Sequence, residues 1–259
     1  MKRKLSARRW LVFLLVLLAL LAVAFFITKY YLSQDAVTER EKAKLPTLSA
    51  GQSPVSSVQS PTANPSPSIN SIPEELNLDV PFTPQAPHAN WDYTHEEACE
   101  EAAVLMAGRY FRGQGISGAD DAEKGLQEII GWEKENLGFF ESTTAEETVR
   151  VIKGIYGLNA QVIENPTVGQ TKVALAQGKL VLSPSAGREI GNPFYKSPGP
   201  LYHILLIKGY TKDKFITNDA GTKRGENYPY VFKTVLDANH DWNGGNVGDG
   251  RKLMIVVSR

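Results

Sequence analysis

The first 28 residues combine a basic stretch with an apolar run. Residues 1–9 contain five Lys or Arg side chains and no acid, and the 19 residues from Trp10 to Thr28 carry no charge. A helix of this length is about 28 Å long, close to the hydrocarbon thickness of a bilayer. The pattern predicts a single-pass transmembrane signal anchor at residues 10–28, with residues 1–9 as a basic cytoplasmic tail and the rest of the chain extracytoplasmic, at the cell membrane. Secretion after signal cleavage near Ala22-Val23-Ala24 is the alternative, although the apolar run is longer than such signals usually have.

The next segment has no apolar period. From Leu45 to Pro73 there is no charged residue, and six prolines alternate with Ser, Thr and Asn. Without a period of 2 or 3.6, the segment has no face to bury. It predicts a Pro/Ser-rich linker over residues 29–73. This linker would hold one globular domain, residues 74–259, away from the membrane.

Within residues 74–259, the apolar spacing predicts four helices and five strands. The first helix runs from Thr94 to about Phe111, with Thr94 and Glu97 in capping-box form, and places Cys99 on its apolar face. The other predicted helices are Ala145–Tyr156, with Thr143/Glu146 or Thr144/Glu147 as caps, 168–177 and 234–241. The predicted strands are Leu78–Phe82 at an edge, Lys179–Leu182, His203–Lys208, Lys214–Asp219 and Leu253–Ser258. Helices first and strands later indicate an α+β fold with an antiparallel sheet.

The composition of residues 74–259 argues against several classes of partner and cofactor. Residues 74–259 contain 19 Lys or Arg and 25 Asp or Glu, a net charge of −6, which argues against nucleic acid or an anionic lipid surface as the main partner. The single Cys cannot form an intramolecular disulfide. Since there is no Gly-rich phosphate loop and no cluster with metal-ligand spacing, we expect no cofactor and no metal.

Two of the predicted strands bring a histidine and a carboxylate together. In a hairpin centred on Thr211, His203 lies directly opposite Asp219, where cross-strand Cβ atoms are about 5 Å apart. Such a pair also occurs for structural reasons, and Cys99 alone is equally a small buried apolar residue. Together the three residues form the Cys, His and acid set of a thiol hydrolase, in the chain order of papain-like enzymes.

Several stretches carry a resemblance to a known family. They are residues 80–85, 97–102, 201–210 and 216–219, and the run 221–228 fits standalone bacterial members. These stretches resemble the papain-like cysteine peptidases related to bacteriocin-processing, double-glycine-leader peptidases, in the expected order over most of residues 78–258. The resemblance implies an α+β fold in which a helical half carrying the Cys packs on an antiparallel β-sheet half carrying the His and Asp, with a cleft between them.

The resemblance also implies catalytic roles. Cys99 is the nucleophile, His203 is the general base and acid, and Asp219 orients the imidazole. Gln85 donates its side-chain amide to the oxyanion beside the backbone N–H of Cys99. The expected activity is hydrolysis of peptide bonds in a peptide or protein substrate, through an acyl-enzyme intermediate.

The sequence departs from the family near the thiol. Glu100-Glu101 stands where relatives commonly have Gly-Pro, and like charges beside a thiol oppose its ionisation. Four acids surround the thiol in the sequence, Glu96, Glu97, Glu100 and Glu101, and most of them are expected to face solvent. Three alternatives stay open: His95 as a stand-in base, a cell-wall amidase or transpeptidase on the same fold, and a non-catalytic peptide-binding module.

Overall fold

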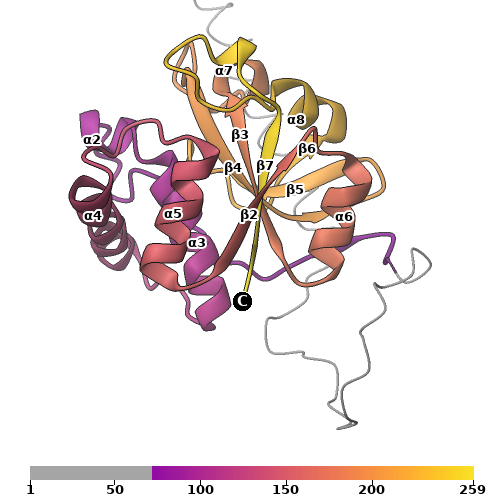
Figure 1. Ribbon diagram of the computed structural model, residues 1–259, viewed down its shortest axis with the longest axis horizontal. Helices are drawn as coiled ribbons and strands as arrows, with labels where there is room; N and C mark the ends of the chain where they lie inside the picture. Colours follow the sequence, from indigo (N-terminus) through magenta and orange to yellow (C-terminus); the bar gives the residue numbers. More distant parts are fainter. Residues whose placement is uncertain (1–71) are drawn as a thin grey trace, which may run out of the picture. The chain divides into compact units, whose positions relative to one another are not determined.

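A computed structural model describes residues 72–259 (Figure 1). The predicted anchor at residues 10–28 and the linker up to residue 71 lie outside the described residues. Between residues 72 and 259, no helix is both long enough and apolar enough to cross a bilayer. The helices are α2 (Tyr93–Glu96), α3 (Cys99–Arg112), α4 (Ala119–Asn136), α5 (Ala145–Tyr156), α6 (Val168–Ala176), α7 (Gly187–Ile190) and α8 (Phe232–Ala238), with a 3-10 turn at Val247–Asp249. The strands are β1 (Leu76–Asn77), β2 (Asn159–Glu164), β3 (Leu180–Ala186), β4 (Tyr202–Tyr210), β5 (Lys214–Asn218), β6 (Tyr228–Val231) and β7 (Leu253–Ser258).

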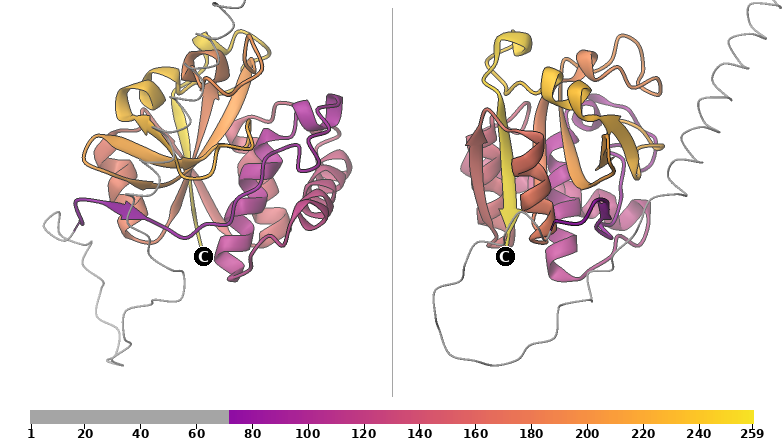
Figure 2. Two further views of the ribbon diagram at one scale, coloured as in Figure 1. Left: turned by 180° about the vertical axis from the view of Figure 1, so that it is seen from behind. Right: turned by 90° about the vertical axis from the view of Figure 1, so that its right-hand side faces the viewer.

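The strands form one seven-stranded sheet in the described part of the chain. Its order is β2-β7-β3-β4-β5-β6, with β1 added to β4, and each of these pairs is antiparallel. Helices α3, α4 and α5 gather on one side of the sheet, whereas α6 and α8 lie on the other side (Figures 1 and 2). The predicted α+β class, with a helical part packed on an antiparallel sheet, is confirmed.

The core lies between the central strands and α3. Every residue of β3 and β4 is buried, as are the first ten residues of α3, Cys99–Gly108. Apolar burial of this kind is the main favourable term in folding. A helix that is enclosed on all sides leaves no solvent face for its polar residues, so the acids at the start of α3 are carried into the interior.

The predicted helix from Thr94 to Phe111 is wrong at its start. The chain forms a single turn, α2, whose N-cap is Asp92, because the Asp92 side chain accepts the backbone N–H of His95. At Ala98 the backbone has φ −95° and ψ 29°, outside the helical range, and α3 begins at Cys99. The thiol therefore lies in the first turn of a 14-residue helix rather than beyond the first turn of a longer one.

The predicted edge strand at Leu78–Phe82 is also wrong. The strand itself is Leu76–Asn77, just before it, and the pairing with β4 ends at Leu78, whose N–H donates to the carbonyl of Lys208 at 3.0 Å. Pro81 has no N–H to donate to a ladder. The carbonyls of Val80 and Pro81 accept instead from the side chain of Asn218, at 3.2 Å each, so a side chain satisfies this segment in place of a neighbouring strand.

Other predicted elements are confirmed, and several elements were not predicted. Helix α5 and strand β7 have the predicted bounds, and Thr144 and Glu147 form the capping box of α5. The unpredicted elements are the long helix α4, the short α7, and strands β2 and β6.

The hairpin of β4 and β5 has a different register from the predicted one. Ile207 pairs with Thr217, and beyond a bulge at Lys208 Gly209 pairs with Ile216. The bulge lies where β1 pairs with β4. A Cβ on Gly209 would stand 2.2 Å from the carbonyl oxygen of Leu76. This register extends to place Asp219 opposite Leu205, not opposite His203. The pairing of His203 with Asp219 is therefore diagonal.

Candidate active site

Cys99 opens helix α3, where backbone N–H groups lack partners within the helix. The sulfur lies 2.9 Å from Oε2 of Glu100, at hydrogen-bond distance, and it also accepts the backbone N–H of Ile204 in β4. The side chain is buried, with 4% of the residue exposed. Burial raises the pKa of the thiol, and a negative charge on Glu100 raises it further. A helix N-terminus favours the thiolate, so ionisation of this thiol depends on what else stabilises the anion.

His203 and Asp219 lie together at the end of the β4–β5 hairpin. Nε2 of His203 is 2.8 Å from Oδ1 of Asp219, and neither residue is exposed. Diagonal neighbours on one sheet face are about 7–8 Å apart at the backbone, a separation that a long side chain such as His spans. The other ring nitrogen, Nδ1, is buried and has no hydrogen-bond partner. In a neutral ring with its proton on Nε2, Nδ1 is free to accept a proton.

The carboxylate of Asp219 is held by five groups. Oδ2 accepts from Asn192 at 2.9 Å, from Tyr195 at 2.7 Å and from Tyr230 at 2.6 Å. Oδ1 accepts the backbone N–H of Gly221 in addition to the contact with His203. Burial alone raises the pKa of Asp219, but the charge of His203 and these hydrogen bonds lower it overall. Asp219 is therefore an ionised, fixed partner for the imidazole.

Two of these supporting residues were not anticipated. Asn192 and Tyr195 come from the connection between α7 and β4, which has no periodic pattern in the sequence. The Tyr195 ring lies edge-on to the His203 ring, with centroids 5.4 Å apart. The next residue, Lys196, forms an exposed ion pair with Glu96 of α2 at 3.4 Å. The 191–201 segment thus reaches from the sheet to the helical part and covers His203.

Gln85 lies close to the turn before Cys99. Its side-chain Nε2 donates to the carbonyls of His95 and Glu96, at 2.8 and 3.0 Å, and its backbone N–H donates to Ala220. Both amide hydrogens therefore have acceptors already. Gln85 fixes the end of α2, and it can donate to an oxyanion only by releasing one of these two carbonyls.

His95 has both ring nitrogens occupied. Nδ1 lies 2.7 Å from Asp92 and Nε2 lies 2.9 Å from Glu123. Burial lowers the pKa of His95, but the two carboxylates outweigh burial and raise it overall. This histidine is bound within the helical part, so it has no free nitrogen with which to replace His203 as a base.

The acids beside Cys99 do not face solvent as expected. Glu100 and Glu101 are buried, and Glu101 lies near the buried Glu133 of α4, with no hydrogen-bond partner for either of its carboxyl oxygens. Burial, followed by the charge of Glu133, raises the pKa of Glu101, and burial raises the pKa of Glu133 to about 8. Sequence spacing could not reveal this, because it does not show that α3 is enclosed on all sides.

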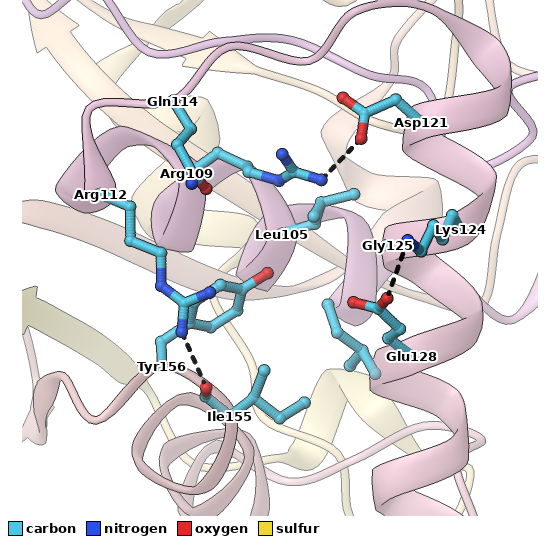
Figure 3. Close-up of a pocket in the computed structure, with 11 residues that line it drawn as sticks. Leu105, Arg109, Arg112, Gln114, Asp121, Lys124, Gly125, Glu128, Ile155 and Tyr156 are labelled. Atoms are coloured by element: carbon cyan, nitrogen blue, oxygen red, sulfur yellow. Dashed lines mark hydrogen bonds and ion pairs between the residues drawn. The ribbon is translucent and has the colours of Figure 1, made fainter.

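A cavity of about 320 Å³ lies far from the thiol (Figure 3). It opens at the last turn of α3, about 15 Å along the helix from Cys99 at 1.5 Å per residue. Its rim holds an ion pair of Arg109 and Asp121 at 2.7 Å, and Arg112 stacks over the Tyr156 ring. The cavity shares no lining residue with the set around Cys99, His203 and Asp219.

The four predicted site residues fall into two groups. His203 contacts Asp219, and the sulfur of Cys99 accepts the N–H of Ile204, the residue that follows His203 in β4. Gln85 lies beside the same turn with its donors engaged. A thiol at a helix N-terminus, an imidazole with one free nitrogen and a fixed carboxylate form a set that can carry out nucleophilic acyl transfer.

Comparisons with known proteins find a likeness among solved structures. No protein-family model matches the chain, and no curated protein matches it. Among solved structures, the chain is similar to a protein of Bacillus anthracis described as a "putative C39-like peptidase", with a TM-score of 0.45 and 13% identity over 70% of this chain and 95% of that one. A likeness this distant carries no argument about activity, and the link to bacteriocin-processing peptidases stays a prediction.

Proposed function

We propose that this protein is a thiol peptidase that cleaves peptide bonds with Cys99 as nucleophile, His203 as base and Asp219 as the group that orients His203. The observation that carries the proposal is the state of the imidazole. One nitrogen is held by a buried carboxylate, and the other is buried without a partner on the strand that contacts the thiol. A buried ring nitrogen without a partner is costly in a structural histidine, whereas a general base requires one.

The proposed reaction begins with proton transfer. The S–H bond of Cys99 breaks and an N–H bond forms at Nδ1 of His203. The proton on Nε2 of His203 stays there and remains hydrogen-bonded to Asp219. The thiolate attacks the peptide carbonyl, and the backbone N–H of Cys99 at the start of α3 donates to the oxyanion. His203 then returns its proton to the leaving amine, and water releases the acyl group by the reverse sequence. Gln85 joins the oxyanion site if substrate displaces one of its carbonyl partners.

Substrate reaches Cys99 only when the covering segment opens. Cys99, His203 and Asp219 are almost fully buried, and Tyr195 lies over His203. The link of Lys196 to Glu96 is exposed, and exposed ion pairs contribute only about 0–1 kcal/mol. We propose that a bound peptide displaces the 191–201 segment from α2.

The test compares peptide hydrolysis by the full-length chain in mild detergent with that by Cys99→Ser, His203→Ala and Asp219→Asn. Wild type should cleave members of a peptide library, and Cys99→Ser and His203→Ala should be slower by roughly 10³-fold or more. His88→Ala is the matched control, because His88 is half-exposed and pairs only with the exposed Asp120. Peptide binding without turnover would instead favour a binding module, and cleavage restricted to wall-peptide amides would favour an amidase.

We also propose that residues 10–28 hold the enzyme at the cell membrane, with residues 72–259 on the extracytoplasmic side. The basic flank and the 19 uncharged residues support this placement. The full chain should sediment with membranes, and deletion of residues 1–28 should leave it soluble. Recovery of a shortened, soluble product from the full chain would instead show signal cleavage.

A further inference from the structure

The carboxyl group of Glu100 contacts the reacting atom of the proposed mechanism. Its Oε2 lies 2.9 Å from the sulfur of Cys99, and its Oε1 accepts the backbone N–H of Thr143 at 3.1 Å. Both side chains are buried. An acid in this place either opposes thiolate formation by its charge or assists it by donating a hydrogen bond. Whether Glu100 opposes or assists ionisation of the thiol depends on whether its carboxyl group is protonated.

The surroundings of Glu100 favour the protonated form. The titratable groups that face it are Glu97 and Glu101 around the start of α3, Glu133 from α4, Tyr202 of β4 and the thiol itself. Asp241 lies behind Tyr202, whose hydroxyl donates to it, and His203 stands next to the Ile204 N–H that contacts the sulfur. Burial, and then the charge of Glu101, raise the pKa of Glu100 well above its usual range.

The hydrogen bonds assign the proton to one oxygen. In a carboxylic acid the carbonyl oxygen is the better acceptor, and Oε1 is the oxygen that accepts from Thr143. The proton therefore lies on Oε2, which faces the sulfur. With Oε2 protonated, the contact at 2.9 Å runs from Glu100 to Cys99, and the S–H is free to turn toward Nδ1 of His203.

We propose that Glu100 acts as a neutral carboxylic acid that donates its Oε2–H to the Cys99 sulfur and stabilises the thiolate formed when His203 takes the thiol proton. The inference rests on the proposed thiol chemistry. One S–H bond breaks and one N–H bond forms at His203, while Glu100 keeps its proton throughout. The sulfur anion then accepts two donors, the carboxyl O–H and the Ile204 N–H. This explains how an acid can lie next to the thiol without suppressing it.

The first experiment measures thiolate formation directly. Cys99 is the only cysteine of the chain, so the ultraviolet absorbance of the thiolate, corrected with Cys99→Ser, reports a single group. The full chain in detergent is titrated, and its rate of alkylation by iodoacetamide is measured over the same pH range. Wild type should form the thiolate well below the pH of a free thiol, about 8.5, and His203→Ala should lose this property.

Variants of Glu100 then give opposite signs for the two possible roles. Glu100→Ala removes the donor and should slow alkylation at neutral pH by roughly tenfold to a hundredfold, the range for a hydrogen bond to a charged group. Glu100→Gln keeps an N–H for the sulfur and an oxygen for Thr143, and should stay within about threefold of wild type. Glu135→Gln, at an exposed position of α4, is the control for a change from carboxyl to amide.

Faster alkylation in Glu100→Ala or Glu100→Gln, by tenfold or more, would show that Glu100 is an ionised brake and overturn the proposal. If Glu100→Ala does not fold, the direction of the change in alkylation rate in Glu100→Gln decides between the two roles of Glu100. A band of a protonated carboxyl in the infrared difference between wild type and Glu100→Gln is also expected, and its absence would equally overturn the proposal. No effect of His203→Ala would mean that the peptidase proposal fails, and the role of Glu100 with it. If His203→Ala slows alkylation but the Glu100 variants speed it, the peptidase proposal stands and only the role of Glu100 is wrong.

Discussion

At the scale of single residues, the site is defined by which polar atoms have partners. His203 has one nitrogen on Asp219 and the other without a partner, and Asp219 accepts from three side chains on a single oxygen. Because a buried carboxylate with several donors is strongly held, Asp219 fixes the imidazole in one tautomer and one orientation. In the proposed mechanism, the basicity of His203 therefore depends on the residues that hold Asp219.

Tyr195 allows a test of this dependence. Tyr195→Phe keeps the ring over His203 but removes one of the donors to Asp219. With a donor lost, the pKa of Asp219 rises, so the carboxylate is protonated at a higher pH as the solution is acidified. We expect kcat for peptide hydrolysis to fall by roughly tenfold with KM little changed, and activity to be lost at a higher pH on the acid side.

Tyr210→Phe is the control for this experiment. Tyr210 is also buried, but its hydroxyl donates to the carbonyl of Pro73, away from the site. It should change stability without moving the acid limb of the pH profile. Equal pH profiles for Tyr195→Phe and wild type would show that the Tyr195 hydroxyl does not support Asp219.

The sequence predicted the contact of His203 with Asp219 but not its geometry. A hairpin centred on Thr211 places His203 directly opposite Asp219. In the structure the bulge beside Gly209 shifts the register, and the contact is diagonal. The contact survives because both residues still share one face of the sheet. The burial of Glu100 could not be predicted in this way, since a charge next to a cysteine looks the same in the sequence whether the helix is half-exposed or enclosed.

At the scale of elements, the strongest patterns were the most predictive. Helix α5 has a capping box and a glycine stop, and strand β7 is an uninterrupted apolar run, so both have the predicted bounds. Helix α4 was missed although Leu126, Ile129 and Ile130 follow helical spacing, because two glycines and the buried Glu133 dilute its apolar stripe. Its place beside α3 explains Gly125, because a Cβ there would stand 2.6 Å from the Leu105 side chain of α3.

Gly154 tests this packing. A Cβ on Gly154 of α5 would stand 2.1 Å from the ring of Trp132 in α4. Replacing a helical glycine by alanine normally stabilises by about 0.5–1 kcal/mol. Because the indole is large and rigid, we expect Gly154→Ala instead to lower the free energy of unfolding by about 1–3 kcal/mol, the usual range for overpacking. Urea unfolding followed by tryptophan fluorescence measures this change.

Gly131 supplies a matched control within α4. Nothing lies within 4 Å of a Cβ built at Gly131, so Gly131→Ala should gain the ordinary helical stabilisation of about 0.5–1 kcal/mol. Opposite signs at the two glycines would confirm the close contact between α4 and α5. Stabilisation at both would mean that Trp132 moves aside at little cost.

At the scale of the whole molecule, the fold unites segments that are far apart in sequence. The site takes the thiol from α3 in the helical part and the imidazole and carboxylate from the β4–β5 hairpin. The sequence could predict these two parts because helical and strand periods are local. It could not predict the covering segment that carries Asn192 and Tyr195, since a connection without periodicity is positioned only by tertiary contacts.

The buried carboxyls also affect the whole molecule, through the pH dependence of its stability. An acid whose pKa is higher in the folded state than in the unfolded chain favours folding while it is protonated. That contribution is lost as the pH rises from the unfolded pKa to the folded one. For Glu133 the window runs from about 4.5 to about 8, and the pKa of Glu101 is raised as well. The domain should therefore become less stable between pH 5 and pH 8, with a slope of up to about 1.4 kcal/mol per pH unit for each proton released.

Glu133→Gln isolates the pair. The carboxamide fills the same space and removes the charge of Glu133, the second cause of the raised pKa of Glu101 after burial. We expect the urea unfolding free energy of this variant to fall less steeply between pH 5 and pH 8 than that of wild type, which should lose on the order of 3 kcal/mol, because one raised carboxyl is removed while Glu100 and Glu101 stay buried. Glu135→Gln, on the exposed side of α4, should keep the wild-type slope. If the unfolding free energies of wild type and Glu133→Gln change equally with pH, the protons released on unfolding are bound at groups other than Glu133. Since Glu101 and Glu133 both act on the neighbourhood of Glu100, that result would also weaken the case for a neutral acid beside the thiol.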